Sequence, residues 1–201
     1  MSGGGNRDVH DDHLPVFRSD AFRRLPYEVR GFIILVNEGI KPAADFEVDE
    51  QQRGDLEALL RLLAISFEGS EIEGRQGSKT KYFISKSKFR AKRLARLDKV
   101  FSKGWSDEDG ILTSEAGGLY GIPSCCLSSY LLRTHGGTKS KSSVEPGDNP
   151  LQHPDEFRYL FYIPCSAGCL ESKELGWQIR QALERLDSAA ATRWREGKLA
   201  T

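Results

Sequence analysis

The apolar residues of this chain recur at intervals of three and four positions and never form a long run. The longest uninterrupted apolar stretch is the five residues from Phe32 to Val36, whereas a membrane-spanning helix needs about twenty. Such spacing is typical of amphipathic helices that cover a common core. A length of 201 residues suits one domain of ordinary size. We therefore predict a soluble, mainly helical α+β single domain that does not bind a membrane.

Helices are predicted wherever the apolar positions share one face. The expected helices cover residues 19–39, 55–67, 88–101, 113–120, 124–134 and 172–188. Pro26 should kink or restart the first helix, and Ser87 should cap the third. The apolar face of that third helix is expected to turn inward with Phe89, Leu94, Leu97 and Phe101.

Strands are predicted in two places. Residues 71–74 and 81–84 flank a polar turn and favour a small β-hairpin. The aromatic stretch 157–163 favours a short buried strand or extended segment that returns the chain to the core.

Three stretches are predicted to lie outside the packed part of the domain, which covers residues 14–188. They are a mobile N-terminal tail at 1–13, a flexible insertion or lid at 138–155, and a fraying C-terminal tail at 189–201. The first eight residues have neither the apolar stretch of a secretory signal nor the pattern of an organelle-targeting peptide. We therefore expect a cytoplasmic protein.

All four cysteines lie between residues 125 and 169, in two short motifs. Gly-Ile-Pro-Ser-Cys-Cys supplies Cys125 and Cys126, and Pro-Cys-Ser-Ala-Gly-Cys supplies Cys165 and Cys169. In a reducing cytoplasm, spaced cysteines more often indicate metal or thiol chemistry than structural disulfides. Each motif falls at or before the predicted start of a helix, where the helix dipole and free backbone amides favour the thiolate.

The cysteines admit three interpretations: ligation of a metal or cluster, a redox or nucleophilic thiol, and packing as small core residues. Two adjacent side chains leave a short piece of backbone in different directions and are hard to place on one tetrahedral ion. The pair therefore favours an iron–sulfur cluster over zinc. His135 lies roughly 13 Å along the helix from Cys126, too far for a fourth ligand. Such a site would serve in a redox or modification reaction, and whether the protein is an enzyme stays open.

A basic segment offers a different class of function. Residues 75–103 hold eleven Lys and Arg against one Asp, in a chain whose 29 basic and 29 acidic residues cancel. One face of the predicted helix carries a stripe of cations, namely Lys88, Lys92, Arg96, Lys99 and Lys103. This stripe would track the phosphates of RNA or single-stranded DNA, while Tyr82 and Phe83 of the hairpin stack on a base. The alternative is a solvated helix face opposite acidic residues such as Asp45, Asp55 and Glu57.

The two cysteine motifs resemble those of an uncharacterised, largely archaeal prokaryotic family that is catalogued as domain of unknown function 483. The segment Asn37-Glu38-Gly39-Ile40-Lys41-Pro42-Ala43-Ala44 is also similar to that family, so the resemblance covers roughly residues 20–188. It implies that the cysteines are the functional positions, and it carries no known activity. No P-loop and no dinucleotide-binding glycine motif occurs in the sequence, so nucleotide binding through either is unsupported.

Overall fold

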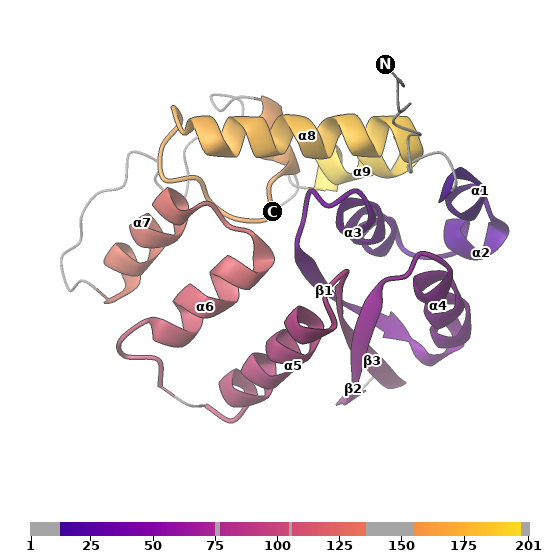
Figure 1. Ribbon diagram of the computed structural model, residues 1–201, viewed down its shortest axis with the longest axis horizontal. Helices are drawn as coiled ribbons and strands as arrows, with labels where there is room; N and C mark the ends of the chain where they lie inside the picture. The colour runs from indigo at the N-terminus through magenta and orange to yellow at the C-terminus, as the bar shows by residue number, and fades with distance from the viewer. Residues whose placement is uncertain (1–12, 75–76, 105, 136–154, 198–201) are drawn as a thin grey trace, which may run out of the picture.

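The computed structural model describes residues 13–74, 77–104, 106–135 and 155–197. The predicted tail up to residue 12, nearly all of the predicted insertion and residues 198–201 lie outside the described part of the chain. Figure 1 shows helices arranged around a small central sheet, which confirms the α+β class predicted from the sequence. Within the described residues, every helix is too short or too polar to cross a membrane.

The sheet is antiparallel and has the strand order β1-β3-β2. Its strands are β1 (Ala43–Asp49), β2 (Ser66–Gly74) and β3 (Gly77–Ser85). The predicted hairpin is confirmed as β2 and β3, which are longer than expected and pair from Ser66 opposite Ser85 to Gly74 opposite Gly77. β1 was not predicted, and it pairs with the other edge of β3.

The two faces of the sheet are covered by different helices (Figure 1). On one face, alternate residues of β1 and β3 pack against α3 (Tyr27–Asn37) and α4 (Glu50–Leu62) in the main core. On the other face, Ala43 and Phe83 meet α5 (Lys88–Ser102) and α6 (Ile111–Tyr120) in a smaller core around Leu94. The period-two alternation of a strand thus divides the apolar residues between two helical layers.

Several helix boundaries follow the sequence signals. Two short helices, α1 (Leu14–Phe17) and α2 (Asp20–Arg23), precede α3, which starts directly after Pro26 as predicted. Ser87 caps α5 by accepting a hydrogen bond from the amide of Arg90, also as predicted. The second predicted helix starts earlier than expected, because α4 begins at Glu50 and contains Asp55 in its interior.

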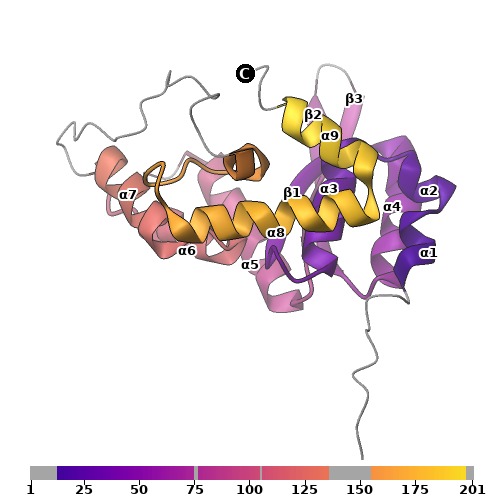
Figure 2. The same cartoon turned by 90° about the horizontal axis from the view of Figure 1, so that it is seen from above.

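The C-terminal part of the chain packs against α3 through its last two helices, while its first helix packs on α6. It consists of α7 (Ser124–His135), a 3-10 turn η3 (Asp155–Tyr159), α8 (Leu170–Leu186) and α9 (Ser188–Gly197). Figure 2 shows α8 running across the molecule, with α7 near its start and α9 folded back beside its end. The predicted fraying tail is therefore wrong for residues 189–197, since Trp194 of α9 is buried against Gly31 of α3.

Two further expectations are corrected by the packing. The aromatic stretch 157–163 returns to the core but forms no strand, because η3 lies directly on α8 and Trp194 donates a hydrogen bond to the carbonyl of Tyr159. On α5, Leu94 and Leu97 are buried as predicted, whereas Phe89 is 74% exposed and Phe101 is 38% exposed. At 100° per residue, Phe89 lies on the outward side of α5, whereas Phe101 lies on the same side as Leu94 and Leu97 but in the last turn of the helix.

Candidate metal centre

The four cysteines meet at one place, between the start of α7 and the start of α8. Their sulfur atoms all lie within 4.8 Å of one another. The Sγ atom of Cys169 lies 3.7 Å from those of Cys125 and Cys126, which are 3.8 Å from each other. Cys126 and Cys169 are buried, Cys165 is half-buried and Cys125 is exposed. The cysteines predicted to form a site are therefore brought together.

The first motif is placed by the turn between α6 and α7. Gly121 ends α6 in the left-handed conformation (φ +75°), and a Cβ atom there would lie 2.5 Å from the ring of Pro42. Only glycine meets both conditions without strain. Pro123 then precedes α7 directly, so Cys125 and Cys126 fall in its first turn. The glycine and proline of the motif thus direct the two thiols toward α8.

The second motif ends as the N-cap of α8. The amide of Cys169 donates to the carbonyl of Ser166, which closes a tight turn between Cys165 and the helix. The amide of Cys165 donates to the sulfur of Cys126, 3.4 Å away. The amide of Cys165 therefore favours the thiolate form of Cys126, a cysteine of the other motif.

Two hydroxyls that contact each other, those of the buried Ser172 and the half-buried Tyr162, lie beside the cysteines. Ser172 is fully buried, and its Oγ lies 3.2 Å from the sulfur of Cys126 and 3.0 Å from the hydroxyl of Tyr162. The sequence pattern does not single out Tyr162, because an aromatic residue in a β-prone stretch is ordinarily a core residue. The nearest signal is its position three residues before Cys165.

The thiols differ in how readily they ionise. Burial alone would raise the pKa of Cys169, but the Ser172 side chain and amide and the neighbouring thiols hydrogen-bond to its sulfur and lower the pKa to about 7. Burial raises the pKa of Cys126, and desolvation together with hydrogen bonds to the other three thiols raises that of Cys125. The N-terminal ends of α7 and α8 both face the cluster and favour negative charge there.

This arrangement is compatible with metal binding. Thiolates are soft ligands that suit zinc, copper(I) and iron–sulfur clusters, and four of them converge here from two separate segments. Core packing does not account for Cys125, which is exposed while its sulfur still faces the other three.

The residues predicted to contact nucleic acid fall into two groups. Those of the cationic stripe are exposed along one face of α5: Lys88, Lys92, Arg96, Lys99 and Lys103. Tyr82 and Phe83 are each 1% exposed, so the prediction that they stack on a base is wrong. The hydroxyl of Tyr82 donates to Glu57, and Phe83 packs beneath α5.

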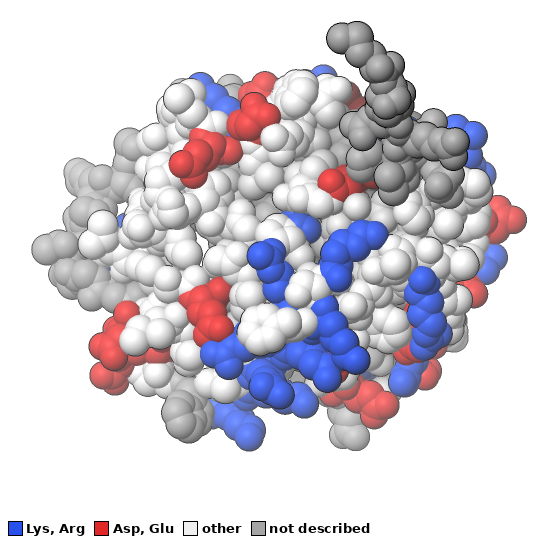
Figure 3. Space-filling model, viewed as in Figure 1, with Lys and Arg blue, Asp and Glu red and all other residues white. Residues whose placement is uncertain are grey.

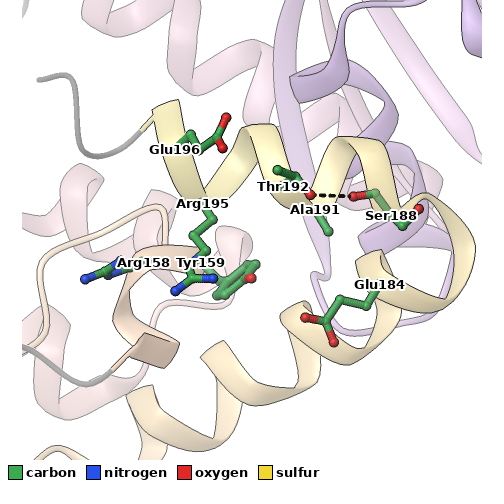
Figure 4. Close-up of a pocket in the computed structure, with 8 residues that line it drawn as sticks. All are labelled: Arg158, Tyr159, Glu184, Ser188, Ala191, Thr192, Arg195 and Glu196. Atoms are coloured by element: carbon green, nitrogen blue, oxygen red, sulfur yellow. Dashed lines mark hydrogen bonds between the residues drawn. The ribbon is translucent and has the colours of Figure 1, made fainter.

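A separate hollow lies between η3, α8 and α9 and contains no cysteine in its lining (Figure 4). It measures about 340 Å³, and charged side chains of both signs surround it, including Arg158, Arg195, Glu184 and Glu196. Arg158 and Arg195 each approach Asp155 at 3.3 Å, so their charge is partly balanced within the protein. The hollow therefore does not indicate one class of ligand.

No family model, curated protein or solved structure matches this chain. The resemblance to the domain of unknown function 483 accordingly stays a prediction, and the functional argument stands on the geometry of the cysteines.

Proposed function

We propose that the four cysteines bind a single tetrahedral zinc ion in a structural centre that fastens α7 to the start of α8. The observation that carries the proposal is the spacing of the sulfurs, three of which are 3.7 to 3.8 Å apart. With a Zn–S bond of about 2.3 Å, the sulfurs of a regular tetrahedron are about 3.8 Å apart. The spacing of the thiols therefore suits one small ion.

The same spacing argues against the iron–sulfur cluster expected from the adjacent pair. A cluster distributes its four thiolates over two or four iron atoms with sulfide between them, so the sulfurs on different iron atoms are separated more widely than on one shared ion. All four sulfurs here lie within 4.8 Å of one another. The expected divergence of Cys125 and Cys126 is small, because both side chains leave the first turn of a helix and their sulfurs are 3.8 Å apart.

A structural role is supported by the ligand number and by the packing of α7. Four protein sulfurs complete a tetrahedral site, whereas catalytic zinc keeps one position for water or substrate. Along its length α7 packs on α6, with the Leu127 side chain seated over Gly117, and its first turn meets the α8 side of the protein at the cysteines. An ion at this point would act as the cross-link between the α6–α7 pair and α8.

Metal and sulfide analysis of protein purified without oxygen tests the proposal. We expect about one zinc per chain and no acid-labile sulfide. Iron accompanied by equimolar sulfide would establish a cluster instead, and a folded protein that contains no metal would refute both ligation proposals.

Substitution separates ligation from folding. Cys169→Ser should abolish zinc binding, whereas Ser128→Ala, an exposed change on α7, should leave it intact. Titration with Co²⁺ gives a second readout, since tetrahedral thiolate ligation produces intense visible and charge-transfer bands. A Cys169→Ser protein that keeps the wild-type metal content and cobalt spectrum would overturn the assignment.

A further inference from the structure

One face of α5 and the turn before it carry a concentrated positive charge. Figure 3 shows Lys and Arg side chains gathered over α5 and the adjoining part of the sheet, with acidic residues at the margins. The residues of this α5 surface are Lys88, Phe89, Lys92, Arg96, Lys99 and Lys103 on one side of the helix, with Lys86 and Arg90 at its N-terminal end. The turn and helix lie far from the start of α8 in the fold, so this surface is independent of the cysteine centre (Figure 1).

The acidic residues that were expected to face this charge are engaged elsewhere. Asp45 pairs with Lys81, Asp55 with Arg24, and Glu57 with Arg53 and Arg61. On α5 itself, Asp98 pairs with Lys81, and Glu115 of α6 pairs with Arg93. Among the described residues, no carboxylate pairs with the six cations of α5 and its C-cap that belong to the surface: Lys88, Arg90, Lys92, Arg96, Lys99 and Lys103. The surface therefore keeps its charge.

An aromatic ring stands within this charge. Phe89 is 74% exposed and lies on the outward side of α5, away from the buried Ala91, Leu94 and Leu97. Lys92 and Arg93 are its neighbours at three and four positions along the helix, and Lys88 precedes it. Spaced cations with an exposed ring are the elements with which proteins bind single strands, since every base has a face that stacks.

We propose that the α5 surface binds a single-stranded nucleic acid, with the cations on its phosphates and Phe89 stacked on a base. The stripe from Lys88 to Lys103 extends about 22 Å, enough for several nucleotides. A membrane does not fit this surface, because the apolar side of α5, which includes Ala91, Leu94 and Leu97, is buried on the protein and cannot enter a bilayer.

The electrostatic part is tested by fluorescence anisotropy with a labelled 12-nucleotide oligothymidylate, using the full-length protein as purified. Wild type should bind at low salt, with an affinity that falls steeply as salt rises. Replacing Lys88, Lys92 and Arg96 together by Ala should reduce the slope of log K against log salt by about two units. The charge-matched control replaces the exposed Arg18, Arg23 and Arg193 by Ala and should leave the slope unchanged.

The stacking part separates a single strand from any other polyanion. Phe89→Ala should weaken binding about 5- to 100-fold without changing the salt slope, and Phe89→Trp should restore it. Trp177→Ala, which removes an exposed ring from α8, is the matched control. No binding at low salt, an unchanged slope in the triple variant, or equal affinities of wild type and Phe89→Ala would each overturn the proposal. If wild type and Phe89→Ala each bound heparin as tightly as oligothymidylate, the surface would attract any polyanion without stacking on bases. That result would also overturn the proposal.

Discussion

At the scale of single residues, Ser172 connects the cysteines to the core of the protein. Its hydroxyl lies between the sulfur of Cys126 and the hydroxyl of Tyr162, and it has no access to water. Groups in this position orient metal ligands and offset their charge, and their loss ordinarily weakens metal affinity 10- to 100-fold. Ser172 therefore holds Cys126 in place for the proposed metal ion.

Ser172→Ala should accordingly lower zinc affinity by about 10- to 100-fold while the protein stays folded. Competition with a chromophoric chelator measures the affinity, and Ser128→Ala on the exposed side of α7 serves as the control. Equal affinities for both variants would show that the hydroxyl only fills space.

Glu57 gives a pH-dependent contribution to stability. A hydrogen bond from the Tyr82 hydroxyl at 2.8 Å and contacts with Arg61 and Arg53 outweigh burial and lower the pKa of Glu57 from its ordinary value of 4.5. A lowered folded-state pKa stabilises the protein above the unfolded-state pKa, and this contribution is lost as pH falls through the folded-state value.

Glu57→Gln should therefore lower the free energy of unfolding by about 1 to 2 kcal/mol at pH 7, because a charge-assisted hydrogen bond becomes a neutral one. The difference from wild type should shrink as pH falls below 4.5. Urea unfolding at several pH values measures it, with the exposed Glu47→Gln as control. A difference that is constant from pH 7 to pH 3 would contradict this account.

At the scale of secondary-structure elements, close backbone approaches determine how the C-terminal segments pack. A Cβ atom on Gly176 of α8 would lie 2.2 Å from the carbonyl oxygen of Glu156 in η3, and backbone there has little room to move. Gly54 in α4 has no atom within 4 Å of the corresponding position. The same substitution should therefore have opposite effects in the two helices.

Gly176→Ala should destabilise the protein by about 1 to 3 kcal/mol through overpacking. Gly54→Ala should stabilise it by about 0.5 to 1 kcal/mol, because alanine loses less backbone entropy in a helix. Urea midpoints measure both, and effects of the same sign would show that the η3–α8 contact relaxes freely.

The elements that the sequence predicts well are those with local signals. Ser87 caps α5, Pro26 restarts the helical pattern at α3, and the β2–β3 hairpin surrounds a polar turn, so neighbouring residues suffice to place each of them. The convergence of the two cysteine motifs is expected from the metal interpretation, which requires soft ligands from separate segments to meet. The sulfur spacing does not, because it depends on how Gly121 and Pro42 set the angle between α6 and α7.

The elements that escape prediction owe their structure to distant partners. The β-propensity of residues 157–163 is overridden because α8 packs against the segment and Trp194 donates a hydrogen bond to the carbonyl of Tyr159. In α9 the apolar face consists of Ala190, Ala191 and Trp194, which is weak in sequence and becomes a core only because α3 offers Gly31 opposite the indole. The helical spacing of these three residues is the sequence feature that indicates a buried helix face in α9.

At the scale of the whole molecule, the proposed zinc ion joins α7 to α8, two helices that pack against different parts of the protein. α7 contacts α6, whereas α8 contacts α3 and α9. The sheet with α3, α4 and α5 has its own core, whereas α7 depends on α6 and on the cysteines. Stability should therefore be uneven, with the α7 end opening locally before the sheet does.

Removal of the metal with a chelator should raise amide hydrogen exchange in residues 124–134 and 160–170 and leave the amides of β3 protected. Mass spectrometry of peptic fragments measures this, with the Cys169→Ser protein as a reference for the metal-free state. A uniform rise across all fragments would show that the ion supports the whole fold.

The packing of Trp194 against Gly31 also determines which parts of the chain can fold first during synthesis. α9 follows α3 by about 150 residues, so α3 leaves the ribosome well before the helix that covers it. At about 5 to 20 residues per second, the nascent chain waits on the order of ten seconds for its partner. During that interval the face of α3 around Gly31 is open to chaperones and proteases. A chain that stops before α9 would contain the whole sheet but would leave this face of α3 uncovered.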